Sequence, residues 1–141
     1  MRIDQFIYHG SQLIESFKVG DSARLDAELL LAQVLNKSRS YFYSHPEYLL
    51  SEEQLEMAQC LVALRCQGRP IAYLQGQKEF WSLSLAVNEG VLIPRPETEM
   101  LVEFALRLKL PANAGVVDLG TGSGAIALAL ASEKNLGRLP P

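Results

Sequence analysis

Residues 116–124, VVDLGTGSG, constrain the fold of this chain more than any other stretch. A hydrophobic segment ends there in an acid, and glycine then stands at every second position from Gly120 to Gly124. Glycine lets the backbone turn with positive φ and lets a ligand approach without a Cβ in the way. A strand over residues 115–119, a glycine turn and an Ala- and Leu-rich helix over residues 124–134 therefore predict a cradle for a nucleotide-like ligand.

Three kinds of ligand compete for this turn. A phosphate-binding loop needs Lys followed by Ser or Thr at its end, and Ala125 and Ile126 stand there instead. A dinucleotide stays open, because Gly120, Gly122 and Ala125 satisfy the G-x-G-x-x-G/A pattern, although that pattern alone is weak. Asp118 favours the third ligand, because its carboxylate would repel a pyrophosphate and attract the amino group of S-adenosylmethionine.

The first two thirds of the sequence predict short amphipathic helices. The first is expected to bury Phe6, Leu13, Ile14 and Phe17 and to close at Gly20, and the second, over residues 21–36, to bury Ala27, Leu30, Leu31, Val34 and Leu35. Ser51 and Gln54 have the spacing of a capping box at the head of a third helix, which ends near Gly68. Between them, Lys37 and Arg39 lie beside aromatic residues that more often close a helical core than bind a partner.

The pattern changes after residue 76. Apolar side chains recur largely at two-residue spacing over residues 78–87, and residues 88–90 are expected to turn the chain into a second strand at 91–94, as a β-hairpin. A helix is expected from Pro96 to Pro111, with acidic residues favourable at its positive end. Its inward face is predicted to carry Met100, Leu101, Phe104, Ala105 and Leu108.

Four stretches together carry a family resemblance. VVDLGTGSGAIALAL resembles the first cofactor motif of class I S-adenosylmethionine-dependent methyltransferases. With GRPIAYLQG, EFWSLSL and VLIPRPETE, it closely resembles the HemK/PrmC family, the protein-(glutamine-N5) methyltransferases of peptide-chain release factors. The pairing of IPRPETE with DLGTGSG at this distance is specific, and the resemblance runs to about residue 134.

The resemblance implies an α + α/β architecture. Residues 1–75 would form a small helical domain that docks the release factor, and residues 76–95 a β-hairpin linker. Residues 96–141 would begin a class I, Rossmann-like methyltransferase domain that is incomplete in this chain. The implied cofactor is S-adenosyl-L-methionine, and the implied partner is a peptide-chain release factor.

The resemblance also assigns site residues. The methionine part of the cofactor would be lined by Gly120, Thr121, Gly122, Ser123 and Gly124, with Asp118 near its amino group. Possible pocket residues are Phe80 and, in the family signature, Arg95, Glu97, Thr98 and Glu99. Acids also suit the first turn of any helix, and an aromatic residue suits any strand, so direct ligand contact and a purely structural role stay open for these.

Two parts of the family pattern are absent from these 141 residues. One is the Asn-Pro-Pro-Tyr motif, which in the family orients the glutamine amide; the other is the acid expected about 20 residues past the glycines, which holds the ribose. No catalytic residue is therefore assigned, and this chain alone is expected to be inactive. Because a parallel strand needs a crossover to reach its neighbour, strand 115–119 is expected to lack a partner and leave Val116 and Val117 partly exposed.

Composition and charge bear on the partners and the cellular location of the chain. A net charge of −3 has the wrong sign for a chain that grips nucleic acid along its length. No apolar run reaches the roughly 20 residues that span a bilayer, and the N-terminus lacks the layout of a signal peptide, so the chain is expected in the cytoplasm without membrane contact. Cys60 and Cys66 are expected to be packing residues, and no metal site is predicted.

Two further hypotheses accompany the methyltransferase. The helical domain could bind release factors without modifying them. A relative of the DNA amino-methyltransferases is disfavoured by the acidic balance and by the lack of a basic stripe.

Overall fold

The computed structural model describes residues 1–111 and 113–134. The chain divides into two compact units, Met1–Gln75 and the residues from Gly76 onward, called unit 1 and unit 2 below. Each is described by itself. None of the described helices is long and apolar enough to cross a membrane.

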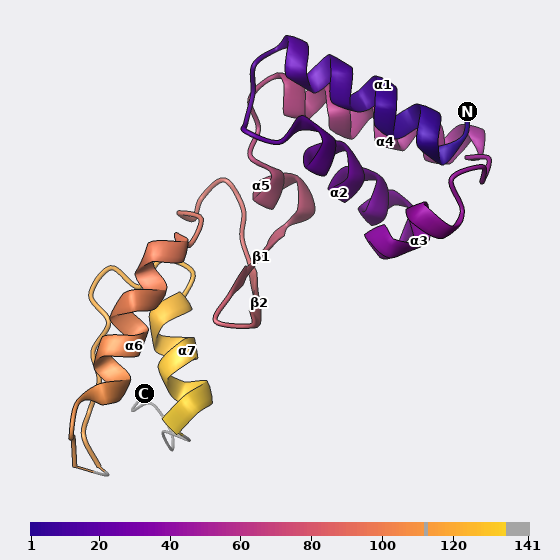
Figure 1. Cartoon of the computed structure of the whole chain (residues 1–141). Helices are drawn as coiled ribbons and strands as arrows, with labels where there is room; N and C mark the ends of the chain where they lie inside the picture. The colour runs from indigo at the N-terminus through magenta and orange to yellow at the C-terminus, as the bar shows by residue number, and fades with distance from the viewer. Residues whose placement is uncertain (112, 135–141) are drawn as a thin grey trace. The chain divides into compact units, whose positions relative to one another are not determined.

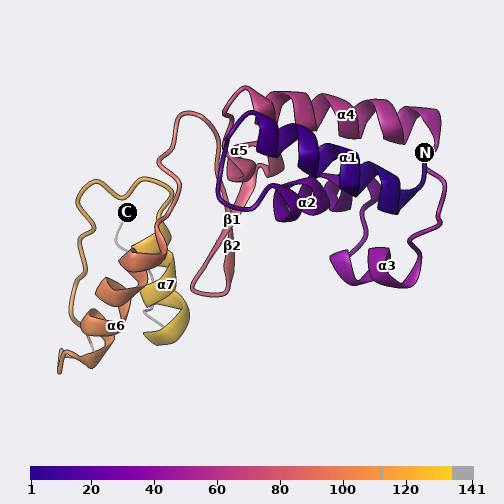
Figure 2. The ribbon, with the colours of Figure 1, turned by 45° about the horizontal axis from the view of Figure 1, so that its top comes forward.

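Unit 1 consists of helices alone. Its elements are α1 (Ile3–Ser16), α2 (Ala23–Leu35), α3 (Arg39–Ser44), α4 (Glu52–Cys66) and α5 (Ile71–Gln75). The three long helices, α1, α2 and α4, lie side by side (Figure 1), and α3 lies against the end of α2 (Figure 2). The segment before α4 returns to the start of α1, where the Ile3 amide donates to the carbonyl of Tyr48 at 3.0 Å.

The core of unit 1 lies between these helices. It buries Ile3, Phe6, Ile7, Ile14, Ala27, Leu30, Leu31, Phe42, Leu50, Ala58, Val62 and Cys66. The predicted capping box is confirmed: the Gln54 amide donates to Ser51 Oγ at 3.2 Å, and the Ser51 amide donates to Gln54 Oε1 at 3.0 Å. The stripe predicted for α2 is also confirmed, with Val34 and Leu35 packed at its edge.

The buried face predicted for α1 is wrong in part. Leu13 is 47% exposed and Phe17 58% exposed, and the helix ends at Ser16 rather than at Gly20. The inward face instead follows Ile3, Phe6, Ile7, Gly10 and Ile14. Gly10 explains the shift, because a Cβ there would lie 3.5 Å from that of Ala27 and 3.7 Å from Val62. Helices α2 and α4 both approach α1 at Gly10. The face of α1 that contains Gly10 is therefore buried, and Leu13 and Phe17 lie outside it.

Unit 2 opens with a two-stranded antiparallel hairpin, β1 (Gln77–Phe80) and β2 (Leu83–Ala86). The predicted hairpin is present, but the prediction of its second strand is wrong. Trp81 and Ser82 take φ of 51° and 60°, so they form a two-residue turn that already pairs β1 with β2. The chain does turn at residues 88–90, where the Gly90 amide donates to Asn88 Oδ1 at 2.9 Å, but residues 91–94 form no strand.

Two helices follow the hairpin. A 3₁₀ turn, Pro96–Thr98, leads into α6 (Glu99–Arg107), and α7 (Ala125–Lys134) packs beside α6 (Figures 1 and 2). Their shared core contains Phe80, Leu85, Val102, Ala125, Ala129 and Leu130. The inward face predicted for α6 is confirmed only for Ala105, which packs against this core with Leu106 beside the buried Val102. It is wrong for the other four residues, because Met100, Leu101, Phe104 and Leu108 are exposed. Contact with α7 and with the buried hairpin residues Phe80 and Leu85 decides which side of α6 is inside.

Residues 115–119 do not form the predicted strand. Val117 is 82% exposed and Leu119 is 90% exposed, whereas Val116 packs partly against the core. A strand exists only through hydrogen bonds to a neighbour, and the described part of the chain offers none to this segment. The helical domain and hairpin of the predicted architecture are thus present, and a Rossmann-like sheet is not seen in the described residues. Residues 135–141 of the predicted third domain lie outside them.

Candidate functional site

The glycine turn joins residues 115–119 to α7. Gly120, Gly122 and Gly124 have φ of 72°, 56° and 79°, values that side-chain-bearing residues rarely adopt. The Gly124 amide donates to the carbonyl of Thr121 at 2.9 Å, and the Gly124 carbonyl accepts from the Leu128 amide at 2.9 Å, which starts the helix. A Cβ at Gly120 would meet nothing within 4 Å. The turn is therefore open on its outer side, and glycine is required there by the backbone rather than by crowding.

Asp118 is held in place by the turn itself. Thr121 Oγ1 donates to Asp118 Oδ2 at 3.0 Å. The other carboxylate oxygen, Oδ1, accepts no hydrogen bond from the residues that the structure describes, and Ser123 lies half-buried near the end of the turn. The arrangement leaves one carboxylate oxygen of the half-buried Asp118 without a described donor, beside a turn in which three of five residues are glycines. Such a group can accept hydrogen bonds from an ammonium or a hydroxyl.

The signature residues Arg95 to Glu99 lie at the start of α6. The Thr98 amide donates to the Arg95 carbonyl at 3.1 Å, which forms the 3₁₀ turn, and the side chains of Arg95 and Glu97 are exposed. In both views α6 and α7 run in the same direction, so their first turns lie toward the same end of the helix pair (Figures 1 and 2). Among the described residues, no hydrogen bond or ion pair joins Arg95 or Glu97 to the glycine turn.

Glu99 and Phe80 have structural partners. Glu99 Oε1 accepts from the backbone amide of Trp81 at 2.9 Å, while the indole Nε1 of Trp81 donates to Glu133 Oε1 at 2.8 Å. Phe80 is buried in the same core as Ala125, the residue that follows the last glycine. The turn of the hairpin is thus hydrogen-bonded to both helices. Phe80 packs in the core that also buries Ala125, the first residue of α7.

Sequence reasoning missed Trp81 and Glu133. The pair Trp-Ser carries none of the Asn-Gly or Asp-Gly signals that mark a two-residue hairpin turn. No turn signal in the sequence therefore indicated that the hairpin would bring these residues to α7. The only usable signal was a tryptophan inside an otherwise alternating strand pattern.

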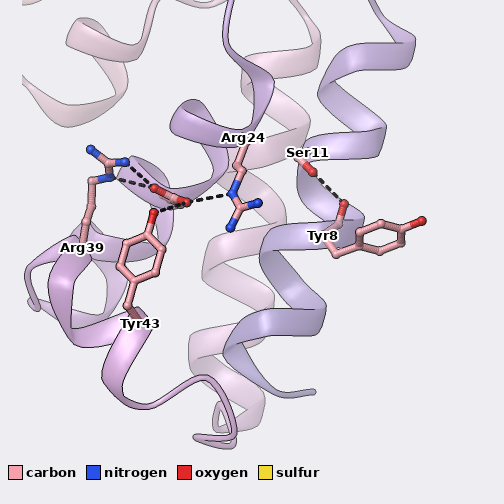
Figure 3. Close-up of polar contacts among 6 residues, drawn as sticks. Tyr8, Ser11, Arg24, Arg39 and Tyr43 are labelled. Carbon is pink, nitrogen blue, oxygen red and sulfur yellow. Dashed lines mark hydrogen bonds and ion pairs between the residues drawn. The ribbon is translucent and has the colours of Figure 1, made fainter.

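A second polar cluster, in unit 1, was also missed (Figure 3). Glu28 of α2 is almost fully buried, and its carboxylate accepts from Arg39 Nε at 2.8 Å, from Arg24 Nε at 3.1 Å and from the hydroxyl of Tyr43 at 3.3 Å. Burial alone would raise the pKa of Glu28, but the hydrogen bonds from Arg39 and Arg24 outweigh it and hold this pKa below its ordinary value. The sequence signal was an acid within an apolar stripe, four residues after an arginine.

The cysteines play no joint role. Cys66 is buried in the core, and burial raises the pKa of its thiol, whereas Cys60 is exposed, so the prediction that both are packing residues is wrong for Cys60. The described residues contain no group of three or more side chains placed to hold a metal ion.

Comparison with known proteins finds a family model that matches part of unit 1 and relatives that match most of the chain. Residues 9–76 match the PrmC N-terminal domain. A release factor glutamine methyltransferase of Shewanella oneidensis is 59% identical over 114 residues, which are 81% of this chain and 40% of the relative. Proteins of the same description from Coxiella burnetii and Escherichia coli are 54% and 46% identical, over 82% and 87% of this chain and 42% and 44% of their own lengths.

The chain thus spans less than half the length of these relatives. The family model, over residues 9–76, covers most of unit 1. The chain belongs to the HemK/PrmC family and corresponds to its N-terminal portion.

Proposed function

We propose that this chain works as part of a release factor glutamine methyltransferase. The reaction would move a methyl group from S-adenosyl-L-methionine to the side-chain amide nitrogen of the glutamine in the Gly-Gly-Gln loop of peptide-chain release factors, in the cytoplasm. The observation that carries this proposal is the 59% identity, over 81% of the chain, to a protein described as a release factor glutamine methyltransferase.

The residues of the glycine turn fit such a cofactor. A Cβ at Gly120 would meet nothing within 4 Å, so there is open space beside the turn, and Asp118 offers a carboxylate oxygen that accepts no hydrogen bond from the described residues. We therefore propose that Asp118 binds the amino group of the cofactor, and that its methionine part lies along residues 120–124. The cofactor would supply an electrophilic methyl group on a sulfonium; the turn would hold it and orient it.

Glu99 has a supporting part in this proposal. Its Oε1 is occupied by the Trp81 amide, so only Oε2 could face a ligand at the start of α6. Arg95, Glu97 and Thr98 keep their proposed place beside the cofactor through the family signature alone. Phe80 would act by supporting the first turn of α7.

Methyl transfer requires the nucleophile to be held in line about 3 Å from the methyl carbon. A glutamine amide is a poor nucleophile, because its lone pair is shared with the carbonyl. Orientation of that amide is assigned in the family to an Asn-Pro-Pro-Tyr motif, which these 141 residues lack. We therefore expect this polypeptide to bind the methyl donor without transferring it.

Titration calorimetry with S-adenosyl-L-methionine tests the site. The chain should bind, and Asp118→Ala should lose roughly tenfold or more in affinity, since a hydrogen bond to a charged group contributes about 1.5–3 kcal/mol. Asp21→Ala, which removes an exposed acid from unit 1, is the matched control and should bind as the unchanged chain does. Equal affinity of the two variants would remove Asp118 from the site.

Unit 1 favours a second, non-catalytic function. It has its own closed core, and residues 9–76 match the PrmC N-terminal domain. We propose that unit 1 docks the release factor, whether or not the glutamine is then methylated. Binding of a purified release factor to this chain in the absence of S-adenosyl-L-methionine would support docking, and a strict requirement for the cofactor would contradict it.

A further inference from the structure

A small hollow lies between α1, α2 and α3 in unit 1. Its volume is about 250 Å³, which suits a side chain rather than a whole small-molecule ligand. Ile3, Ile7 and Phe42 form its apolar part, and Tyr8, Ser11 and Arg24 lie along the edge that it shares with a larger hollow of about 690 Å³ between α1 and the start of α2. A bound segment could therefore place one side chain in the small hollow and continue across the larger one.

Arg24 lines this hollow and has donor atoms that could bind a ligand. Its Nε donates to Glu28, while its terminal nitrogens Nη1 and Nη2 form no hydrogen bond or ion pair with the residues of the described ranges. The side chain is 71% exposed. In Figure 3 the guanidinium of Arg24 lies between Arg39 and Tyr43 on its left and Ser11 and Tyr8 of α1 on its right.

The carboxylate of Glu28 fixes this guanidinium. Arg39 and Tyr43 donate hydrogen bonds to the same carboxylate (Figure 3). These bonds keep Glu28 in its buried position, so the partner of Arg24 does not move. A guanidinium held through Nε presents its two outer nitrogens as a fork with its orientation already set. Less side-chain entropy is then lost when a ligand binds, which favours recognition of a carboxylate.

The charges around the hollow favour an anionic group. The two acids that line it are both engaged: Asp4 pairs with Arg2 at 2.7 Å, and Glu28 pairs with Arg39 and Arg24. Nη1 and Nη2 of Arg24 are therefore the charged donors of this lining that have no partner among the described residues. A cation entering the hollow would meet no free carboxylate, whereas a carboxylate would meet a free guanidinium fork.

We propose that this hollow receives an acidic side chain of the release factor. Its carboxylate accepts hydrogen bonds from Nη1 and Nη2 of Arg24, and its methylene groups lie against Ile3, Ile7 and Phe42. Glu28 is the positioning residue for Arg24. The identity of the partner rests on the function proposed above, and the site within unit 1 rests on the geometry.

Binding of the full chain to purified Shewanella oneidensis release factor, measured by titration calorimetry, tests the proposal. Arg24→Gln should weaken the affinity roughly tenfold or more, and Arg24→Lys should restore part of it, because Lys keeps the charge without the fork. Arg107→Gln, which removes an equally exposed arginine from unit 2, is the matched control and should change little. Circular dichroism checks that each variant remains folded.

A charge exchange gives the sharper test. Arg24→Glu should abolish measurable binding, and one Asp→Lys or Glu→Lys substitution on the release factor should restore it, which a merely structural role of Arg24 would not allow. If the unchanged chain binds and Arg24→Gln binds equally well, the docking site is overturned and the proposed function stands. If no substitution on the release factor restores binding to Arg24→Glu, the acidic side chain is the wrong occupant. If the unchanged chain does not bind the release factor, both the proposed docking by unit 1 and the proposed site at Arg24 are contradicted.

Discussion

The two units use the same kind of helix with opposite results. In unit 1 the apolar faces of α1, α2 and α4 pack against one another, and even an acid, Glu28, is buried while its hydrogen-bond partners reach it from the surface. In unit 2, α6 and α7 share a small core, while Met100, Leu101 and Phe104 point outward together with Val117 and Leu119. The difference shows that amphipathic periodicity produces helices, but that the number of neighbours decides how much apolar surface they bury.

The aromatic residues allow the two units to be followed separately. All five tyrosines lie within residues 1–75, and the single tryptophan, Trp81, lies in the hairpin turn of unit 2. Tryptophan fluorescence therefore reports on unit 2, and far-ultraviolet circular dichroism is dominated by the helices of unit 1.

The largest effect is expected in the core of unit 1. Ile14→Ala should lower the free energy of unfolding by about 2–5 kcal/mol, because a fully buried side chain leaves a cavity. Leu13→Ala, one residue earlier on the exposed side of α1, should change it by no more than about 0.5 kcal/mol. Urea unfolding followed by circular dichroism measures both. Similar losses for the two variants would contradict the observed face of α1.

The next effect concerns the buried acid. Glu28→Gln should lower the stability of unit 1 at neutral pH by about 1–3 kcal/mol, because hydrogen bonds to a charged carboxylate are weakened. The pKa of Glu28 is lowered in the folded state, so its stabilisation is complete above the ordinary value of 4.5 and is lost as the pH falls through the lower, folded value. Unfolding measured from pH 7 downward should therefore show a shallower loss of stability below pH 4.5 in the variant. Parallel curves for the two proteins would contradict this.

A smaller difference is expected between helix starts. Ser51→Ala should destabilise unit 1 by about 1 kcal/mol, because it removes the side-chain cap of α4. Thr98→Ala should cost only about 0.3 kcal/mol, because Thr98 makes no side-chain hydrogen bond at the start of α6. Thermal unfolding by circular dichroism measures the first and tryptophan fluorescence the second. An equal loss in both would mean that Thr98 caps α6 in solution.

The smallest effect on stability is expected on the exposed face of α6. Phe104→Ser should change the stability of unit 2 by no more than about 0.5 kcal/mol, but it should reduce self-association, because it removes a large exposed apolar side chain. Sedimentation velocity over a range of concentrations measures the association. Glu103→Ser on the same helix is the control and should not reduce it. A marked loss of stability in Phe104→Ser would mean that this face is covered.

Much of the fold was predictable where the signal is local. The capping box at Ser51 and the stripe around Leu30 and Leu31 follow from short-range spacing alone, and the structure confirms both. The hairpin was predicted, but its turn was placed too late, because Trp81 and Ser82 carry no turn signal. The roles of Asp118 and the glycines as a cofactor site remain predictions. The structure shows that three of the glycines have a left-handed backbone conformation and that Thr121 holds the Asp118 carboxylate through a hydrogen bond.

The sequence by itself determined the long helices but not the short helices α3 and α5, and it indicated the presence of a hairpin and, through paired motifs, the family. These depend on neighbours within a few residues or on a pattern of residue types. Only the tertiary structure decided which side of α1 and α6 is inside, and that Glu28 binds Arg24, Arg39 and Tyr43. The sequence already indicated that residues 115–119 would lack a strand partner, and the structure adds that they form no strand. The physical reason is that a helix forms its own hydrogen bonds, whereas a buried face, an ion-pair cluster and a strand each need a partner from elsewhere in the chain.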